Sequence, residues 1–400
     1  MSTSSNRSSE RPAEPDGRGR AAVLNRRQAL HRLLAGTAAS LGLPALAQND
    51  RRIVLGQSAA LSGPAAQLGL QMNAGATIYF DRLNAEGGVA GRSIQLRALD
   101  DGYEPERCRA NTATLIDKDG VFALFGYVGT PTSLAALPLV NAAGVPFFAP
   151  FTGAEALREP FSKWVFHVRA SYYDETELIV KQLTHLGLRR IAVFRQNDSY
   201  GQAGLDGAVR ALKARNLAPV AVGLVERNST DVAAAVKAIV AAAPDAVVQI
   251  SAYKSCAAFI RGARKAGYGG TFHNVSFVGT QALADELGKD AKGVVVSQVM
   301  PYPFATTTAL AREYIDAVRK AGNGATPNYS SMEGYVAAKV FTEGLRRAGG
   351  NPTREALVGA LESLQRYDAG GYLVNFGPRN HRASSFVELT MLSGDGKILR

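Results

Sequence analysis

Residues 53–100 read IVLGQSAALSGPAAQLGLQMNAGATIYFDRLNAEGGVAGRSIQLRALD, and the apolar spacing changes twice along this segment. Residues 53–59 form a short β-branched and apolar run that predicts a strand. Apolar residues then recur at helical spacing over 66–84, which predicts a helix. Residues 93–100 return to a strand pattern. The segment therefore predicts a βαβ unit with parallel strands.

The same alternation continues along the chain and predicts an α/β protein with two Rossmann-like units in tandem. In the first unit we expect a helix at 104–118, a strand at 121–125, a helix at 131–143 and a strand at 146–149. In the second unit we expect helices at 174–186, 201–214, 231–242 and 256–266, and strands at 191–194, 220–225 and 246–250. The remaining elements are a strand at 294–299, helices at 308–321, 331–348 and 353–364, and a hairpin of strands 372–376 and 386–392.

The N-terminal segment, 1–47, differs from the rest of the chain and predicts a cleaved export signal. Its first 20 residues are a polar mixture that cannot bury a core, so we expect them to be disordered. Arg26-Arg27 precedes an apolar run at 33–46, which overlaps an A-x-A cleavage pattern, Ala45-Leu46-Ala47. This order fits a twin-arginine-like or a general secretory signal. The run is shorter than the roughly 20 apolar residues of a membrane span, so we expect a soluble mature chain from Gln48.

The net charge of +11 does not indicate nucleic-acid binding. The predicted leader holds seven arginines and three acidic residues, so the mature chain keeps +7, and its basic residues are scattered without a stripe interleaved with aromatics. The two cysteines, Cys108 and Cys256, fall in different predicted units, where a disulfide would lock the units together. We therefore expect two free or buried thiols. The five histidines are dispersed, and we predict no metal site.

The strand–helix junctions lack nucleotide-binding and catalytic motifs. The first junction, GQSAALSGP at 56–64, has no G-x-G-x-x-G, and P-loop, G-x-S-x-G and H-E-x-x-H patterns do not occur in the sequence. Ser251 and Lys254 match S-x-x-K without its companion motifs, and Asp100-Asp101 is typical of a turn and cap. We therefore predict a binding protein with no cofactor.

The stretch GYVGTPTS at 126–133 predicts an anion site at a helix start. Thr130 stands before a proline, which is typical of an N-cap followed by the first helical residue. Free amides of Thr132 and Ser133 and the helix dipole would then favour a negative charge, and Gly129 would keep the approach open. We expect a ligand carboxylate here, with the alternative that Thr130 only caps its own helix.

Further loops follow neighbouring strands and are expected at the same edge of each sheet. One contains Phe151 and Thr152, although Thr152 with Glu155 also fits a T-x-x-E capping box. In the second unit, Tyr200 follows the strand at 191–194 and Tyr253 follows the strand at 246–250. Two tyrosines there could cover a ligand with their rings while their hydroxyls donate hydrogen bonds.

Five stretches together resemble the leucine/isoleucine/valine-binding protein family, the type I periplasmic binding proteins of ABC transporters. Each is modest alone, but their order and spacing are specific, and the resemblance extends from Ile53 to about Leu392. The stretches are LSGPAAQLG at 61–69, NAEGGVAG at 84–91, LDD at 99–101, GVP at 144–146 and DSYG at 198–201.

The resemblance implies two α/β lobes joined by three crossings, with a ligand in the cleft between them. By position, Thr130 corresponds to the residue that holds the ligand carboxylate, Thr152 lies in the loop that helps at the amino group, and Tyr200 and Tyr253 close over the ligand. The predicted ligand-binding residues are Thr130, Thr152, Tyr200, Tyr253, Ser276, Gly129, Leu68 and Phe151.

The chain departs from the family pattern at several of these positions. Ser276 stands where amino-acid binders place an acidic side chain against the ligand ammonium, and Leu68 replaces an aromatic residue. Tyr103 and Gly129 occupy the places of a disulfide that some members carry. A serine cannot neutralise a buried ammonium. A free amino acid leads as the expected ligand, and aliphatic or aromatic carboxylates and amides stay open.

We predict crossings near Ala170, Val299 and Arg382, with lobe I formed by 52–169 plus 299–382 and lobe II by 170–298 plus 383–400. The expected function is that of a monomeric, periplasmic solute-binding protein that captures a small-molecule ligand by hinge closure and delivers it to an ABC permease in the inner membrane. A ligand-sensing subunit that feeds a receptor or regulator, and an exported α/β enzyme, are the alternatives.

Overall fold

The computed structural model describes residues 52–322 and 324–400. The predicted export signal at 1–47 lies outside the described residues. Within the described part, no helix combines the length and the apolar character that a membrane crossing requires.

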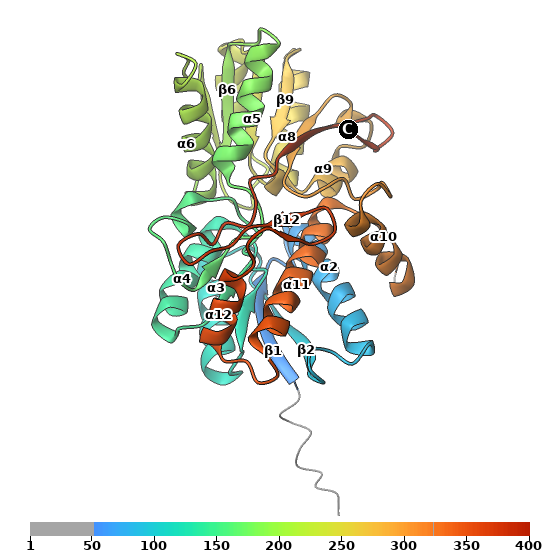
Figure 1. The fold of residues 1–400 in the computed structure, drawn as a ribbon. Coiled ribbons are helices and arrows are strands. Elements are labelled where there is room, and N and C mark those ends of the chain that lie inside the picture. Colours follow the sequence, from blue (N-terminus) through green and yellow to red (C-terminus); the bar gives the residue numbers. More distant parts are fainter. Residues whose placement is uncertain (1–51, 323) are drawn as a thin grey trace, which may run out of the picture. The chain divides into compact units, whose positions relative to one another are not determined.

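The first sheet has five parallel strands in the order β2-β1-β3-β4-β5. Its strands β1 and β2 lie in the lower part of Figure 1. β1 pairs with β2 along its whole length, from Arg52 opposite Ser93 to Ala59 opposite Asp100. The apolar side chains of β1 and β3 are buried because helices cover both faces. The strands are β1 (Arg52–Ala59), β2 (Ser93–Asp100), β3 (Ala123–Phe125), β4 (Phe147–Phe148) and β5 (Val165–Phe166).

The second sheet has seven strands in the order β14-β13-β10-β9-β8-β6-β7. β6 to β10 run parallel, and β13 and β14 add an antiparallel edge. The strands are β6 (Ile191–Gln196), β7 (Val222–Val225), β8 (Ala246–Ile250), β9 (Thr271–Asn274), β10 (Val295–Gln298), β13 (Glu388–Leu392) and β14 (Ile398–Leu399). A separate two-stranded sheet joins β11 (Tyr367–Asp368) to β12 (Leu373–Val374).

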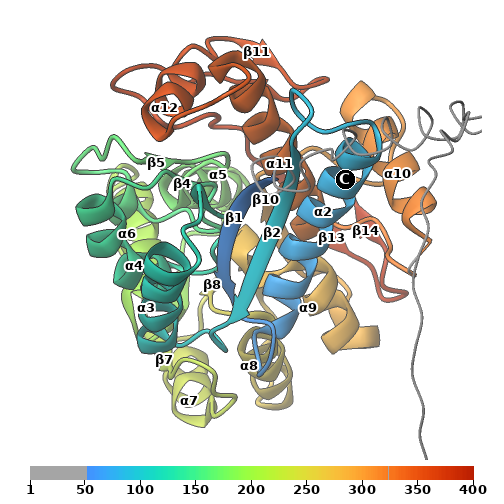
Figure 2. The ribbon, with the colours of Figure 1, turned by 90° about the horizontal axis from the view of Figure 1, so that it is seen from below.

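Helices pack in pairs on the sheets. α2 packs on α11 and α3 on α4, and Figure 2 shows β1 and β2 between α2 on one side and α3 and α4 on the other. α5 packs on α6, and α7 and α9 both pack on α8. The helices are α2 (Ala66–Ala85), α3 (Pro105–Ala113), α4 (Thr130–Ala143), α5 (Tyr172–His185), α6 (Ser199–Lys213), α7 (Ala233–Ala241), α8 (Tyr253–Lys265), α9 (Thr280–Leu287), α10 (Ala309–Ala321), α11 (Tyr329–Ala348) and α12 (Arg354–Glu362).

The chain passes between the two large sheets three times: after β5, after β10, and between β12 and β13. The first and third passages hydrogen-bond to each other. The His167 amide donates to the His381 carbonyl at 2.8 Å, and the Ala383 amide donates to the His167 carbonyl at 2.8 Å. The two connections are therefore one paired ribbon where they cross.

The structure corrects one predicted supersecondary motif. The expected C-terminal hairpin is wrong, because β12 pairs with β11 whereas β13 pairs with β10 and β14. The turn itself is present, as an isolated bridge between Gly377 and Asn380, and the Asn375 amide donates to the Ala383 carbonyl at 2.9 Å beside it. Both cysteines are free and buried, as expected: Cys108 lies in α3 and Cys256 in α8.

Candidate ligand-binding site

The N-terminus of α4 carries Thr130 at the carboxyl edge of the first sheet. The chain enters α4 through Gly129, whose φ of 103° is readily adopted only by glycine. A Cβ on Gly129 would lie 2.2 Å from Cε2 of Tyr103, so the tyrosine ring packs directly against this turn. Thr130 is 1% exposed. The turn therefore holds the Thr130 hydroxyl in the interior.

The start of α4 differs from the prediction by one residue. Gly129 is the N-cap and Thr130 is the first helical residue, so the expected Thr130 cap is wrong. Because the helix begins earlier, the Ser133 amide donates to the Gly129 carbonyl at 3.1 Å and is not free. Proline has no N–H, which leaves the amides of Thr130 and Thr132 outside the helix's own hydrogen bonds.

A chain of hydroxyls continues from Thr130 into the neighbouring loop. Oγ1 of Thr130 lies 2.6 Å from Oγ1 of Thr152, which lies 3.3 Å from the Tyr172 hydroxyl. Thr152 also accepts the Ala154 amide at 3.2 Å. The predicted capping box of Thr152 and Glu155 is wrong, because the helical turn at Glu155 begins after Ala154 without a side-chain cap. Thr152 instead faces Thr130.

Four aromatic side chains, called the aromatic group below, connect loops from both sheets. Tyr103 and Phe151 follow strands of the first sheet, and Tyr200 and Phe277 follow strands of the second. The Phe277 ring centroid lies 4.6 Å from that of Tyr200, 5.6 Å from Phe151 and 5.9 Å from Tyr103. Tyr200 also contacts Tyr172 at 5.4 Å between centroids. The predicted residues Thr130, Thr152, Phe151 and Tyr200 thus belong to one buried cluster.

A buried ion pair borders the aromatic group. Nε and Nη2 of Arg169 each donate to a carboxylate oxygen of Glu333 at 2.9 Å, and the guanidinium lies 4.3 Å from the Phe151 ring centroid. Within residues 52–322 and 324–400, Nη1 of Arg169 and the hydroxyls of Tyr200 and Ser133 find no hydrogen-bond partner. The cluster therefore contains buried polar groups that its own side chains leave unsatisfied.

Ser276 does not stand free in the site. Its amide and its hydroxyl donate to the two carboxylate oxygens of Glu175 at 2.7 and 3.0 Å, and Ser297 Oγ donates to the same carboxylate at 2.5 Å. Burial raises the pKa of Glu175, which Arg169 and these donors oppose. Position 276 lacks an acidic side chain, but Glu175 in α5 brings a carboxylate to the same place. That carboxylate already accepts three hydrogen bonds.

Leu68 and Tyr253 lie beside the start of α2. A Cβ on Gly279 would lie 2.4 Å from Cδ2 of Leu68, so this leucine packs against the turn before α9. Tyr253 begins α8, and its hydroxyl faces the backbone of Gln67. Among the described residues, no hydrogen bond or ring contact joins either side chain to the aromatic group.

Several residues of the cluster were not predicted. Phe277 directly follows a predicted residue, and the S-x-x-D pattern of Ser171 and Asp174, a capping box in the structure, could have placed Tyr172 at a helix start. No sequence signal indicated that Arg169 and Glu175 would be buried. The unpredicted residues are Tyr103, Arg169, Tyr172, Glu175, Phe277 and Glu333.

Comparison with known proteins agrees with the fold. The model of the family described as "Periplasmic binding protein" matches residues 52–397. A curated relative, Leu/Ile/Val-binding protein homolog 8 of Brucella suis biovar 1 (strain 1330), is 26% identical over an alignment of 394 positions that covers 92% of this chain and 96% of the relative.

Two solved structures are also similar. A possible leucine/isoleucine/valine-binding protein from Rhodopirellula baltica SH 1 has a TM-score of 0.83 and 35% identity, covering 88% of this chain and 97% of that one. A substrate-binding periplasmic protein from Ralstonia solanacearum has a TM-score of 0.82 and 33% identity, covering 87% and 99%. The chain has the type I periplasmic binding protein fold and belongs to the leucine/isoleucine/valine-binding-protein-like family of periplasmic binding proteins.

Proposed function

We propose that this chain is the solute-binding protein of an ABC importer and captures a branched-chain amino acid, or a related small carboxylate or amide, by hinge closure. Lobe I, 52–169 plus 299–382, and lobe II, 170–298 plus 383–400, would close on the ligand about the three crossings. The proposal depends above all on two buried donors without a partner: the hydroxyl of Tyr200, within the aromatic group, and Nη1 of Arg169, beside it.

The donors of the cluster suit a carboxylate. An unsatisfied buried polar group costs about 1–3 kcal/mol, which a ligand oxygen would recover. Thr130 can donate its hydroxyl hydrogen to the ligand if Thr152 gives up its 3.3 Å bond to the Tyr172 hydroxyl and donates to Thr130 instead. The aromatic group would then cover the apolar part of the ligand.

The state of Glu175 separates two ligand classes. Its carboxylate already accepts three hydrogen bonds from Ser276 and Ser297, so a ligand ammonium would compete with them. An amino acid would therefore have to share this carboxylate with the serines, whereas a 2-oxo acid or an aliphatic carboxylate would not. Both classes belong to the proposal, and matched ligands distinguish them.

A ligand screen tests the function directly. Thermal shift and calorimetry would use leucine, its 2-oxo analogue 4-methyl-2-oxopentanoate, leucinamide and phenylacetate. A ligand at 100 times its dissociation constant stabilises the folded state by about 2.7 kcal/mol, which a melting curve resolves. Binding of at least one compound is expected. If none of these small carboxylates and amides raises the melting temperature, the proposed ligand class is wrong.

Substitution of Thr130 tests the carboxylate site. Thr130→Ala should weaken binding of the compound found in the screen by about 1.5–3 kcal/mol, the usual contribution of a hydrogen bond to a charged group. Thr130→Ser keeps the hydroxyl and should retain most of the affinity. If calorimetry shows that Thr130→Ala binds with unchanged affinity, the ligand carboxylate does not bind at Thr130.

The proposed location, oligomeric state and transport partner are supported by the family and by the predicted export signal. Periplasmic binding proteins work outside the cytoplasm. Export by the signal at 1–47 would deliver a monomeric protein to the periplasm, where its partner is the ABC permease of the inner membrane.

A further inference from the structure

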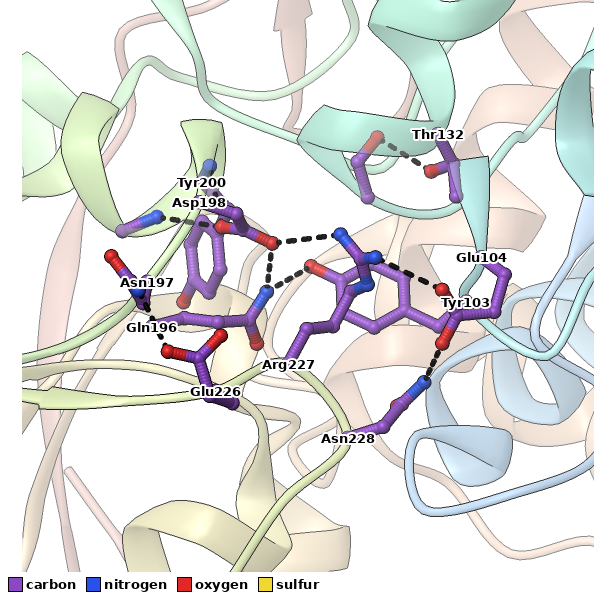
Figure 3. A network of polar contacts seen from close by, with 12 residues as sticks. Tyr103, Glu104, Thr132, Gln196, Asn197, Asp198, Tyr200, Glu226, Arg227 and Asn228 are labelled. Carbon is purple, nitrogen blue, oxygen red and sulfur yellow. Dashed lines mark hydrogen bonds and ion pairs between the residues drawn. The ribbon is translucent and has the colours of Figure 1, made fainter. Parts of the chain in front are cut away.

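A second polar network joins loops of the two sheets beside the aromatic group (Figure 3). Arg227 Nη2 donates to Glu104 at 2.9 Å, and Asn228 Nδ2 donates to Glu104 at 2.8 Å and to the Gly102 carbonyl at 3.1 Å. Gln196 Nε2 donates to the Tyr103 hydroxyl at 3.2 Å. The loop after β2 is thus held by the end of β6 and by the loop that follows β7.

The first-sheet side of this network has a fixed backbone. Gly102 and Tyr103 both have a left-handed conformation, with φ of 57° and 66°. Tyrosine rarely adopts such a φ, so the surrounding structure must hold it there. The Asp101 carboxylate accepts the Tyr103 amide at 2.8 Å and the Ser58 hydroxyl at 2.7 Å. The loop therefore presents Tyr103 and Glu104 in one defined orientation.

The second-sheet side connects the network to Tyr200. Asp198 caps α6 by accepting the amides of Tyr200 and Gly201 at 3.0 and 3.3 Å. Its other oxygen accepts Gln196 at 2.5 Å and Arg227 at 3.4 Å. Arg227 thus links Glu104 of the first sheet to the cap that positions the Tyr200 ring.

We propose that Arg227 and Asn228 act as a latch, in which they hold Glu104 across the two sheets and set ligand affinity without touching the ligand. The affinity part rests on the proposed function. Apparent affinity falls when the binding-competent arrangement is less populated, so release of the latch weakens binding. The side chains of Arg227 and Glu104 are 24% and 42% exposed, so salt screens this pair and affinity decreases as ionic strength rises.

The first test needs no ligand. Hydrogen exchange of the ligand-free protein is compared for the wild type, Arg227→Met and Arg261→Met. Arg261 pairs with Asp290 at 3.2 Å within the second-sheet part of the chain and is the matched control. Arg227→Met should speed hydrogen exchange both in residues 101–104 and in residues 226–228. Arg261→Met should change exchange in neither segment. Faster exchange confined to 226–228 would overturn the latch.

The second test measures affinity by calorimetry with the compound found in the ligand screen. Arg227→Met and Glu104→Gln should each weaken binding by about two- to fivefold, the range of a partly exposed ion pair. The double variant should weaken it by no more than either single variant. Wild-type affinity should fall with added salt more steeply than that of Arg227→Met. The role in binding would be contradicted if the loss of affinity in the double variant equalled the product of the two single losses. It would also be contradicted if all variants bound with equal affinity. If no compound binds, the proposed function is wrong, and the hydrogen-exchange experiment still tests whether the latch exists.

Discussion

At the scale of single residues, Asp101 is a buried carboxylate whose ionisation opposes folding. Burial raises its pKa from the ordinary 3.8 to about 6, although the Ser58 hydroxyl and the Tyr103 amide stabilise the charged form. Because the folded pKa is the higher one, the stabilising contribution is complete below pH 3.8 and is lost as the pH rises through 6.

Substitution of Asp101 by asparagine should remove this pH dependence. The amide stays neutral and can still accept the Tyr103 N–H and hydrogen-bond to Ser58. The free energy of unfolding of the wild type, relative to Asp101→Asn, should fall by about 2–3 kcal/mol between pH 4 and pH 7. Urea unfolding at four pH values measures the difference, and a constant difference between the proteins would contradict the assigned ionisation.

The sequence identified those site residues that stand next to a local signal. Thr130 was found through its proline and glycine neighbours, and Tyr200 through its place after the predicted strand at 191–194. Arg169 was missed because its burial depends on Glu333, which is 164 residues away. A pairing over such a distance leaves no mark on the local pattern.

At the scale of elements, α2 and α11 pack closely because two glycines remove the side chains between them. A Cβ on Gly75 would lie 1.7 Å from the Ser331 carbonyl oxygen, and one on Gly334 would lie 2.1 Å from that of Met72. These atoms belong to the backbone, so neither helix can yield without moving as a whole.

Alanine at either glycine should therefore destabilise the protein. Gly75→Ala and Gly334→Ala are expected to lower the free energy of unfolding by at least about 1–3 kcal/mol, the usual cost of overpacking. Gly359→Ala is the control: this glycine lies in α12 with no atom within 4 Å of an added Cβ, and alanine there should stabilise by about 0.5–1 kcal/mol. Denaturant unfolding compares the three variants, and equal effects would contradict the close helix contact.

Long periodic elements were predicted within a few residues of their bounds, as for α2 and β2. The strand predicted at 146–149 is present as β4, whereas the two-residue strand β5 is too short to show a period and was not predicted, and β9 was missed altogether. The terminal hairpin failed for another reason. Its turn at 377–380 forms, but β12 pairs with the preceding strand β11, and β13 pairs with β10 and β14. A local turn signal does not determine strand pairing.

At the scale of the whole molecule, the Arg169–Glu333 pair links the first passage between the sheets to α11. Both side chains are almost fully buried, at 1% and 3% exposure. A buried ion pair contributes little net stability relative to apolar side chains of similar size, but removal of one partner leaves the other charge unpaired. The pair therefore matters more for its position in the fold than for the energy it adds.

Single and double substitutions should separate these two effects. Glu333→Gln should lower the free energy of unfolding by about 3–5 kcal/mol, because the buried guanidinium loses its counter-ion. The double variant Arg169→Met/Glu333→Leu should recover most of this loss, yet it should bind the screened ligand more weakly, because Nη1 of Arg169 is gone. Glu343→Gln, which breaks the exposed pair with Arg347, should change stability by less than about 0.5 kcal/mol. Urea unfolding and calorimetry on the same proteins measure both quantities. A double variant as unstable as Glu333→Gln would mean that the pair itself is required for the fold, whereas full ligand affinity in that variant would exclude Arg169 from the site.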